Sequence, residues 1–208
     1  MIKIASMNKF KLGPEYFHIL LIMLFFFSAV FSQTSELTNF NSYRNGVNQS
    51  AMLALGGWAI GNITIGSVLY FKTSGSNKYF HQMNIAWNLV NLGIAGIGYY
   101  SSINPDTTIT LMKSLKEQSN IEKILLFNAG LDIAYVMTGF YMKERSKNSE
   151  NNSDRFKGYG NSLILQGTFL FVFDLTLYYF QVKNNLPLEP LLSLVYFTPG
   201  QIGFRFSF

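Results

Sequence analysis

The sequence contains no cysteine. This absence excludes disulfide bonds, thiolate nucleophiles, iron–sulfur clusters and zinc ribbons, and it leaves the redox compartment undetermined. Charge is also scarce: Asp, Glu, Lys and Arg make up 13% of the 208 residues, against roughly 25% in typical soluble domains. Aromatic residues reach 16%, with twenty Phe and twelve Tyr. This balance predicts a membrane protein.

Recognisable chemical motifs are missing as well. We find no glycine-rich nucleotide fingerprint, P-loop, nucleophile elbow, zinc-protease motif or EF-hand loop. The net charge is +5, but the basic residues are scattered between apolar runs, so nucleic acid is not expected as a partner. No cofactor or metal is expected either. An enzyme is disfavoured but stays open, because intramembrane enzymes often use dispersed polar residues.

Residues 1–32 have the composition of a signal peptide. Three lysines precede the apolar run at 19–31, and Val30 and Ser32 suit the −3 and −1 positions of a cleavage site. We therefore expect a mature chain that begins at Gln33. The alternative is that the same apolar run remains as an uncleaved anchor.

The rest of the chain predicts an all-α fold, a four-helix transmembrane bundle made of two antiparallel helical hairpins. Apolar segments long enough to cross a bilayer recur within residues 33–182. The expected spans are about 51–71, 80–101, 124–142 and 158–180. A C-terminal tail, 183–208, follows a proline-containing break, and its alternating phenylalanines favour a short β-hairpin.

The connections between the spans predict the topology. The segments 72–78 and 143–157 hold seven Lys or Arg, which places them in the cytoplasm of a bacterial inner membrane. The mature N-terminus and the tail then lie on the periplasmic side. The charged 143–157 segment is expected to be a mobile loop, and the S-x-x-E spacing at 119–122 predicts a helix start before the third span. On the outer side, Arg44 is expected to anchor at lipid headgroups, with a salt bridge to an aspartate as the alternative.

Polar residues inside the spans are the candidate site. On the second span, His81, Asn84, Asn88 and Asn91 fall on one helical stripe beside Trp87, and such a stripe needs protein partners in hydrocarbon. The third and fourth spans each carry one charge, Asp132 and Asp174. The topology puts residues of all four spans at a similar depth, where they can form one polar layer. The candidate ligand-binding residues are Trp58, Asn62, Asn84, Trp87, Asn88, Asn91, Asn128, Asp132, Gln166 and Asp174.

Two interpretations of this layer remain open. The aspartates can hold a proton, a cation or a polar ligand, and if they approach each other they can share a proton. Alternatively, the amides and acids only lock the helices together by hydrogen bonds. A GxxxG step at Gly57 and Gly61 adds a third possibility, close packing against another membrane protein or a second copy.

The chain also resembles a known family. The residues that carry the resemblance are Gly56-Gly57-Trp58-Ala59 with Gly61-Asn62, Tyr79 to Asn84 with Trp87-Asn88, Leu131-Asp132, Gly158-Tyr159-Gly160, Leu165-Gln166-Gly167 and Asp174. Together they resemble an uncharacterised family of signal-bearing, four-span bacterial membrane proteins, known only as a domain of unknown function. The resemblance covers about residues 40–182 and implies no activity.

Three hypotheses of function follow from the sequence. The first is a small bundle that binds or conducts a polar ligand, cation or proton through the Asn/Asp layer. The second is a structural or assembly protein in which these residues only lock helices. The third is an intramembrane enzyme that uses Asp132 and Asp174 in acid–base chemistry.

Overall fold

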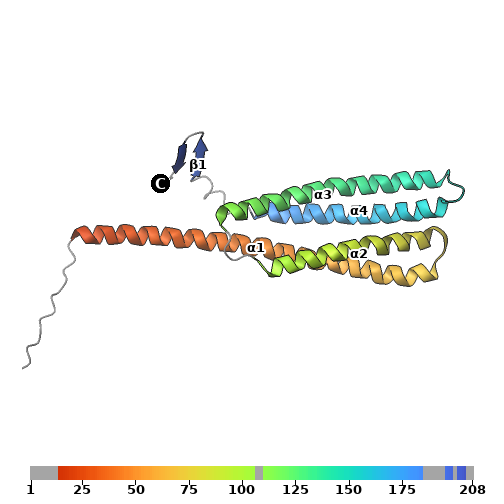
Figure 1. The fold of residues 1–208 in the computed structure, drawn as a ribbon, viewed down its shortest axis with the longest axis horizontal. Helices are drawn as coiled ribbons and strands as arrows, with labels where there is room; N and C mark the ends of the chain where they lie inside the picture. Colours follow the sequence, from red (N-terminus) through yellow and green to blue (C-terminus); the bar gives the residue numbers. More distant parts are fainter. Residues whose placement is uncertain (1–13, 106–109, 185–194, 199–200, 205–208) are drawn as a thin grey trace, which may run out of the picture. The chain divides into compact units, whose positions relative to one another are not determined.

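The computed structural model describes the backbone of residues 14–105, 110–184, 195–198 and 201–204, and the side chains of residues 35–105 and 110–184. The chain divides into two compact units, residues 1–39 and 40–208, and the helical bundle belongs to the second. The elements within the described ranges are α1 (Pro14–Lys72), α2 (Gly75–Ile103), α3 (Leu111–Ser146), α4 (Ser153–Lys183), β1 (Val195–Thr198) and β2 (Gln201–Phe204) (Figure 1). The prediction of a four-helix, all-α bundle is confirmed.

Three of these helices are long and apolar enough to cross a membrane: α1 from Ser35 onward, α3 and α4. The fourth, α2, has 29 residues, about 44 Å of helix against a hydrocarbon core of roughly 30 Å. Its length is therefore sufficient, but it is not among those three helices, and its buried side chains include Asn84, Asn88 and Asn91. Each of the four predicted spans lies inside one helix.

The start of α3 differs from the prediction. The S-x-x-E sequence at 119–122 lies inside the helix, so the predicted helix start there is wrong. The cap is Thr110, whose side chain accepts a hydrogen bond from the backbone N–H of Lys113 at 3.4 Å. The added turns persist because Ser114 and Gln118 are fully buried in the bundle, and tertiary contact outweighs a local capping signal.

The connections are shorter than predicted. α3 ends at Ser146 and α4 begins at Ser153, so most of the 143–157 segment is helical and the prediction of a mobile loop over its whole length is wrong. Basic residues in the last turn of α3 and Asp154 in the first turn of α4 interact favourably with the helix dipoles. Between α1 and α2, Gly75 has a φ of 57°, which glycine adopts without steric cost.

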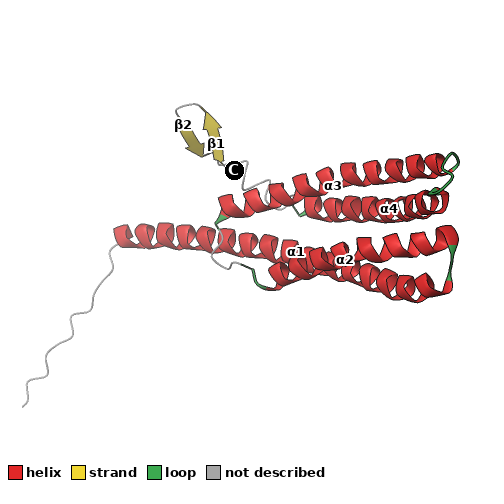
Figure 2. Ribbon diagram, turned by 45° about the vertical axis from the view of Figure 1, so that its right-hand side comes forward, coloured by secondary structure: helices red, strands yellow, loops and turns green. Residues whose placement is uncertain are grey.

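The helices pack in pairs and α4 lies at the centre of the contacts. α3 and α4 run side by side, and α4 also packs against α2 (Figure 2). The two short strands pair antiparallel, Val195 opposite Phe204 and Thr198 opposite Gln201, within the segment for which a hairpin was predicted. The side chains of this tail lie outside the described residues.

Glycines set the spacing of α3 and α4. A Cβ added at Gly139 would lie 2.6 Å from the carbonyl oxygen of Gly160, and one added at Gly167 would lie 2.8 Å from the carbonyl oxygen of Asp132. The backbones therefore approach more closely than any other residue would permit. By contrast, Gly57 has no atom of another segment within 4 Å of such a Cβ, so the predicted GxxxG face is not used in packing among the described residues.

The bundle is polar inside and apolar outside. Among the described residues, thirteen polar or charged side chains are buried, against eight apolar ones. Large apolar side chains on every helix are exposed, for example Ile65 (61%), Ile97 (74%), Phe127 (67%) and Val172 (59%). A soluble domain has the opposite distribution, and exposed apolar surface of this extent is typical of contact with lipid or a partner.

Candidate functional site

An amide cluster joins α1, α2 and α4. Asn84 on α2 is its centre: the side-chain Nδ2 donates to Asn62 Oδ1 at 3.0 Å, and its Oδ1 accepts from Ser162 Oγ and Gln166 Nε2, both at 2.8 Å. The indole N–H of Trp58 donates to Gln166 Oε1 at 3.0 Å. Almost every polar atom of this cluster therefore has a partner within the bundle.

Neighbouring side chains add further hydrogen bonds and a ring contact to the amide cluster. The side chain of Asn88 donates to the backbone carbonyl of Asn84 at 2.8 Å, and that of Asn62 donates to the carbonyl of Trp58 at 2.9 Å. The Trp58 ring stacks on Phe169 with centroids 3.9 Å apart. Such a saturated arrangement holds helices in register and leaves few groups for a ligand.

Asp132 on α3 and Asp174 on α4 form a second polar group, the acid pair. Their carboxyl groups lie close enough to interact with each other, and the exposed fractions of the two residues are 3% and 7%. Oδ2 of Asp132 is buried and has no hydrogen-bond partner among the described residues. Gly167 makes this approach possible, since its missing side chain allows α4 to touch the backbone of Asp132.

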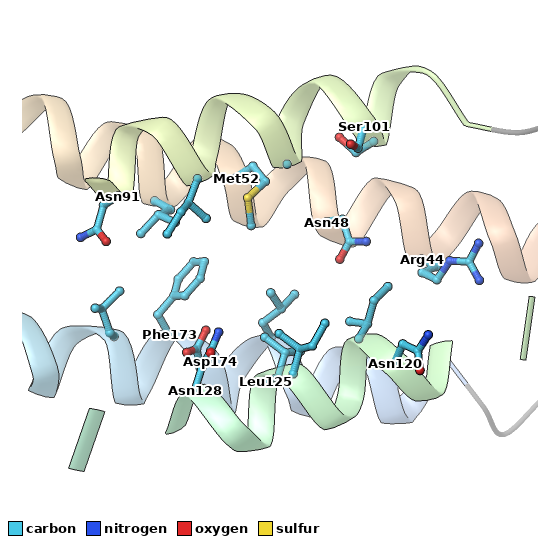
Figure 3. A pocket seen from close by; sticks show the side chains of 18 of the residues that line it. Arg44, Asn48, Met52, Asn91, Ser101, Asn120, Leu125, Asn128, Phe173 and Asp174 are labelled. Carbon is cyan, nitrogen blue, oxygen red and sulfur yellow. The ribbon is translucent and has the colours of Figure 1, made fainter. Parts of the chain in front are cut away.

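The acid pair lines a cavity of about 800 Å³, which we call the acid-pair cavity. All four helices contribute to its wall. Asn91, Asn128 and Phe173 lie toward the end of the cavity that holds Asp174, and the middle of the wall is apolar, with Met52 and Leu125 among its side chains (Figure 3). Trp87 and Tyr135 also line the cavity. A hollow of about 920 Å³ between α1 and α4 has no charged side chain in its lining.

The other end of the acid-pair cavity carries Arg44 and Glu117. The guanidinium of Arg44 donates to Glu117 Oε2 at 2.8 Å and to the carbonyl of Ser114 at 2.9 Å. Arg44 is only 4% exposed, so the prediction that it anchors at lipid headgroups is wrong. The alternative, a salt bridge to an aspartate, is wrong as well, because the partner is Glu117 on the helical extension of α3.

A further set of buried amides ties the same ends of α1, α3 and α4 together, and sequence reasoning missed it. Gln118 donates to the carbonyl of Gln181 at 2.8 Å, and Gln181 donates to Asn48 Oδ1 at 2.7 Å. Asn184 donates to the carbonyl of Phe40 at 3.0 Å. All of these residues lie outside the predicted spans. The one feature of the sequence that could have indicated this set is the presence of Asn and Gln residues just beyond the ends of the predicted spans.

The structure thus sorts the predicted site residues into two groups. Trp58, Asn62, Asn84, Asn88 and Gln166 belong to the amide cluster, whereas Trp87, Asn91, Asn128, Asp132 and Asp174 line the acid-pair cavity. Asn91 contacts both groups, since its amide donates to Asn88 Oδ1 at 3.4 Å. A metal-ligand set of three or more His, Cys, Asp or Glu side chains is absent from the described residues.

Comparison with known proteins identifies a family. The model of a family of unknown function, DUF6992, matches residues 54–175, which include both the amide cluster and the acid pair. The resemblance to an uncharacterised family is thereby confirmed. No curated protein and no solved structure matches the chain.

Proposed function

The chain belongs to the DUF6992 family, whose function is unknown, and on the geometry of its cavity we propose that it is an integral membrane protein that binds a small ligand at Asp132 and Asp174. The observation that carries this proposal is the acid pair: two buried carboxyl groups adjoin in the wall of an 800 Å³ cavity, and one carboxyl oxygen has no partner among the described residues. Structural polar groups in hydrocarbon are normally satisfied, as those of the amide cluster are.

The membrane placement is part of the same proposal. We propose that all four helices cross the inner membrane, that residues 1–32 act as a cleaved leader, and that the mature N-terminus and the tail are periplasmic. The burial of polar residues and the exposure of apolar ones support the placement of the bundle in a bilayer. The asparagines of α2 are buried on one stripe, which explains how a helix with so many amides can still cross the bilayer.

Identification of bound molecules tests the ligand-binding proposal. The full chain is purified in lipid nanodiscs, and copurifying molecules are identified by mass spectrometry for wild type, Asp132→Asn and Asp174→Asn. Asp154→Asn is the matched control, since Asp154 is exposed at the start of α4. We expect a molecule that is retained by wild type and the control and lost from both cavity variants.

Correct folding of the variants is checked by thermal unfolding of the same samples. If Asp132→Asn and Asp174→Asn fold normally and retain everything that wild type retains, the acids bind no ligand. If both variants unfold at markedly lower temperature, the acids serve to lock α3 to α4, and the structural hypothesis replaces ours.

A second candidate function is assembly through the α1 face that carries Gly57 and Gly61. No other segment of the described chain approaches a Cβ position at either glycine within 4 Å, and Leu53 and Ile60 on the same helix are exposed. Such a face can receive a helix of another membrane protein or of a second copy. A Gly57→Leu and Gly61→Leu double variant that remained as associated as wild type in crosslinking would exclude it.

A further inference from the structure

The acid pair has no cation of its own among the described residues. The ionisable side chains that line the cavity are Arg44 on α1, Glu117, Asp132 and Tyr135 on α3, and Asp174 on α4, and α2 contributes none. The guanidinium of Arg44 forms a salt bridge with Glu117. Glu117 and Asp132 are separated by fifteen residues of α3, about 22 Å along the helix. Two adjoining carboxylates in such a site repel each other, so the pair needs a proton or a cation from outside the chain.

The size and lining of the cavity indicate which kind of cation. A single metal ion needs several oxygen or nitrogen ligands in a small shell, whereas this cavity measures about 800 Å³ and most of its wall is apolar. Three aromatic residues, Trp87, Tyr135 and Phe173, line the same cavity as the acid pair, and the rings of Trp87 and Tyr135 contact each other edge to face with centroids 4.7 Å apart. Aromatic faces attract cations that have lost their water. An organic cation with an apolar body satisfies the carboxyl groups, the rings and the apolar wall at once.

The cavity also has a side that faces outward. Val90 and Ile94 on α2 line the cavity and are 63% and 53% exposed, and Ile124 on α3 lines it and is 58% exposed. An apolar molecule dissolved in the bilayer can therefore reach the cavity between α2 and α3 without crossing water.

We infer that the acid-pair cavity takes a lipophilic organic cation from the membrane and that this cation replaces a proton shared by Asp132 and Asp174. The exchange balances in charge: one monovalent cation enters and one proton leaves to the solvent. This inference rests on the proposed function, since it assigns the chemical class of the ligand that the cavity binds.

The test uses two probes of similar shape and different charge. Tetraphenylphosphonium is the lipophilic cation, and triphenylphosphine oxide is the neutral comparison. Binding to the full chain in nanodiscs is measured by equilibrium dialysis at pH 6 and pH 8, and empty nanodiscs are subtracted. We expect the cation to bind at least tenfold more tightly at pH 8 than at pH 6, and to release protons into a weakly buffered solution. The neutral probe should bind equally at both values.

Variants locate the binding. Asp132→Asn and Asp174→Asn should each weaken cation binding at least tenfold at pH 8 and leave the neutral probe unaffected, while Asp154→Asn changes neither. Ile94→Trp narrows the cavity without touching the acids, so it should weaken both probes. This variant keeps the test informative even if an aspartate variant fails to fold.

The outcomes separate the two proposals. Equal binding of both probes, with no proton release and no effect of the aspartate variants, overturns the organic-cation inference and leaves a ligand-binding cavity. Failure of both probes to bind, combined with no copurifying molecule, overturns the proposed function as well.

Discussion

Asn84 and Asp132 are buried to nearly the same extent, with 5% and 3% of their surface exposed, yet their polar atoms are in opposite situations. The amide of Asn84 is bonded at both ends to three different side chains. One oxygen of Asp132 has no partner at all among the described residues. Buried oxygens of Gln118 and Gln181 also lack a partner in the described part of the chain, but these two side chains hold helix ends together through their N–H groups. Asp132 differs from them because it is an acid that lines the cavity together with a second acid, which is why we assign the amides to the fold and the acids to a ligand.

This assignment predicts the effect of removing Asn84. Asn84→Ala deletes three interhelical hydrogen bonds, and at about 0.6 kcal/mol for each such bond in a membrane protein the loss is about 2 kcal/mol. We expect a lower thermal unfolding temperature in detergent micelles and unchanged probe binding in whatever fraction remains folded. Asn77→Ala, at an exposed position of α2, is the control. An Asn84→Ala variant as stable as that control would contradict the structural assignment.

Residue types and spacing predicted the candidate side chains, but not their partners. The stripe of α2 was predictable because a helix has a fixed period of 3.6 residues, and its asparagines are indeed buried. The partner of Arg44 was not predictable, because Glu117 is 73 residues away in the chain and lies on a part of α3 before the predicted third span. Long-range pairing depends on how helices are offset, and a single sequence carries little information about that offset.

At the scale of the helices, small residues decide which surfaces meet. The GxxxG spacing on α1 is the more conspicuous sequence pattern, but the glycines at which α3 and α4 approach closely are Gly139, Gly160 and Gly167. Gly160 and Gly167 are seven residues apart and so fall on one helical face. The helix positions followed from apolar runs, whereas the helix ends and the glycine contacts depend on neighbouring segments and were only partly predicted.

The glycine contact at the acid pair leads to a prediction. In Gly167→Ala the new methyl group would lie 2.8 Å from the carbonyl oxygen of Asp132 and 2.9 Å from Cγ2 of Val136, so α3 has to move. We expect a loss of stability of about 1–3 kcal/mol, the usual cost of overpacking, together with weaker binding at the acid pair. Thermal unfolding and probe binding measure the two effects.

Gly130 provides the control for this substitution. It lies on α3, and a Cβ added there has no atom within 4 Å. Gly130→Ala should therefore leave the bundle unchanged or stabilise it by up to about 1 kcal/mol, because alanine is the better helix former. If both alanine variants behave alike, the close approach at Gly167 does not hold α3 and α4 in place.

At the scale of the whole molecule, the composition predicted the class of protein, but nothing in the sequence predicted the cavity. Low charge and long apolar runs predicted a membrane bundle, and the exposed apolar surface agrees with it. A cavity arises from the distance between helices that do not fully fill the space between them, and that distance is set by side chains on all four. The sequence therefore placed the aspartates at a common depth, where they could meet in one polar layer, but it gave no indication of the cavity beside them.

The topology of the whole molecule depends on whether α2 crosses the membrane, because this helix is not among the three that are apolar enough to span. The chain has no native cysteine, so a single introduced cysteine reports its own position. We expect Asn104→Cys, after α2, to react with a membrane-impermeant maleimide in intact spheroplasts. Ser74→Cys, before α2, and Glu150→Cys, between α3 and α4, should react only after lysis. If the cysteines at 74 and 104 react from the same side, α2 does not cross the bilayer, its buried amides meet water at one surface, and the acid pair no longer lies within a membrane-embedded cavity.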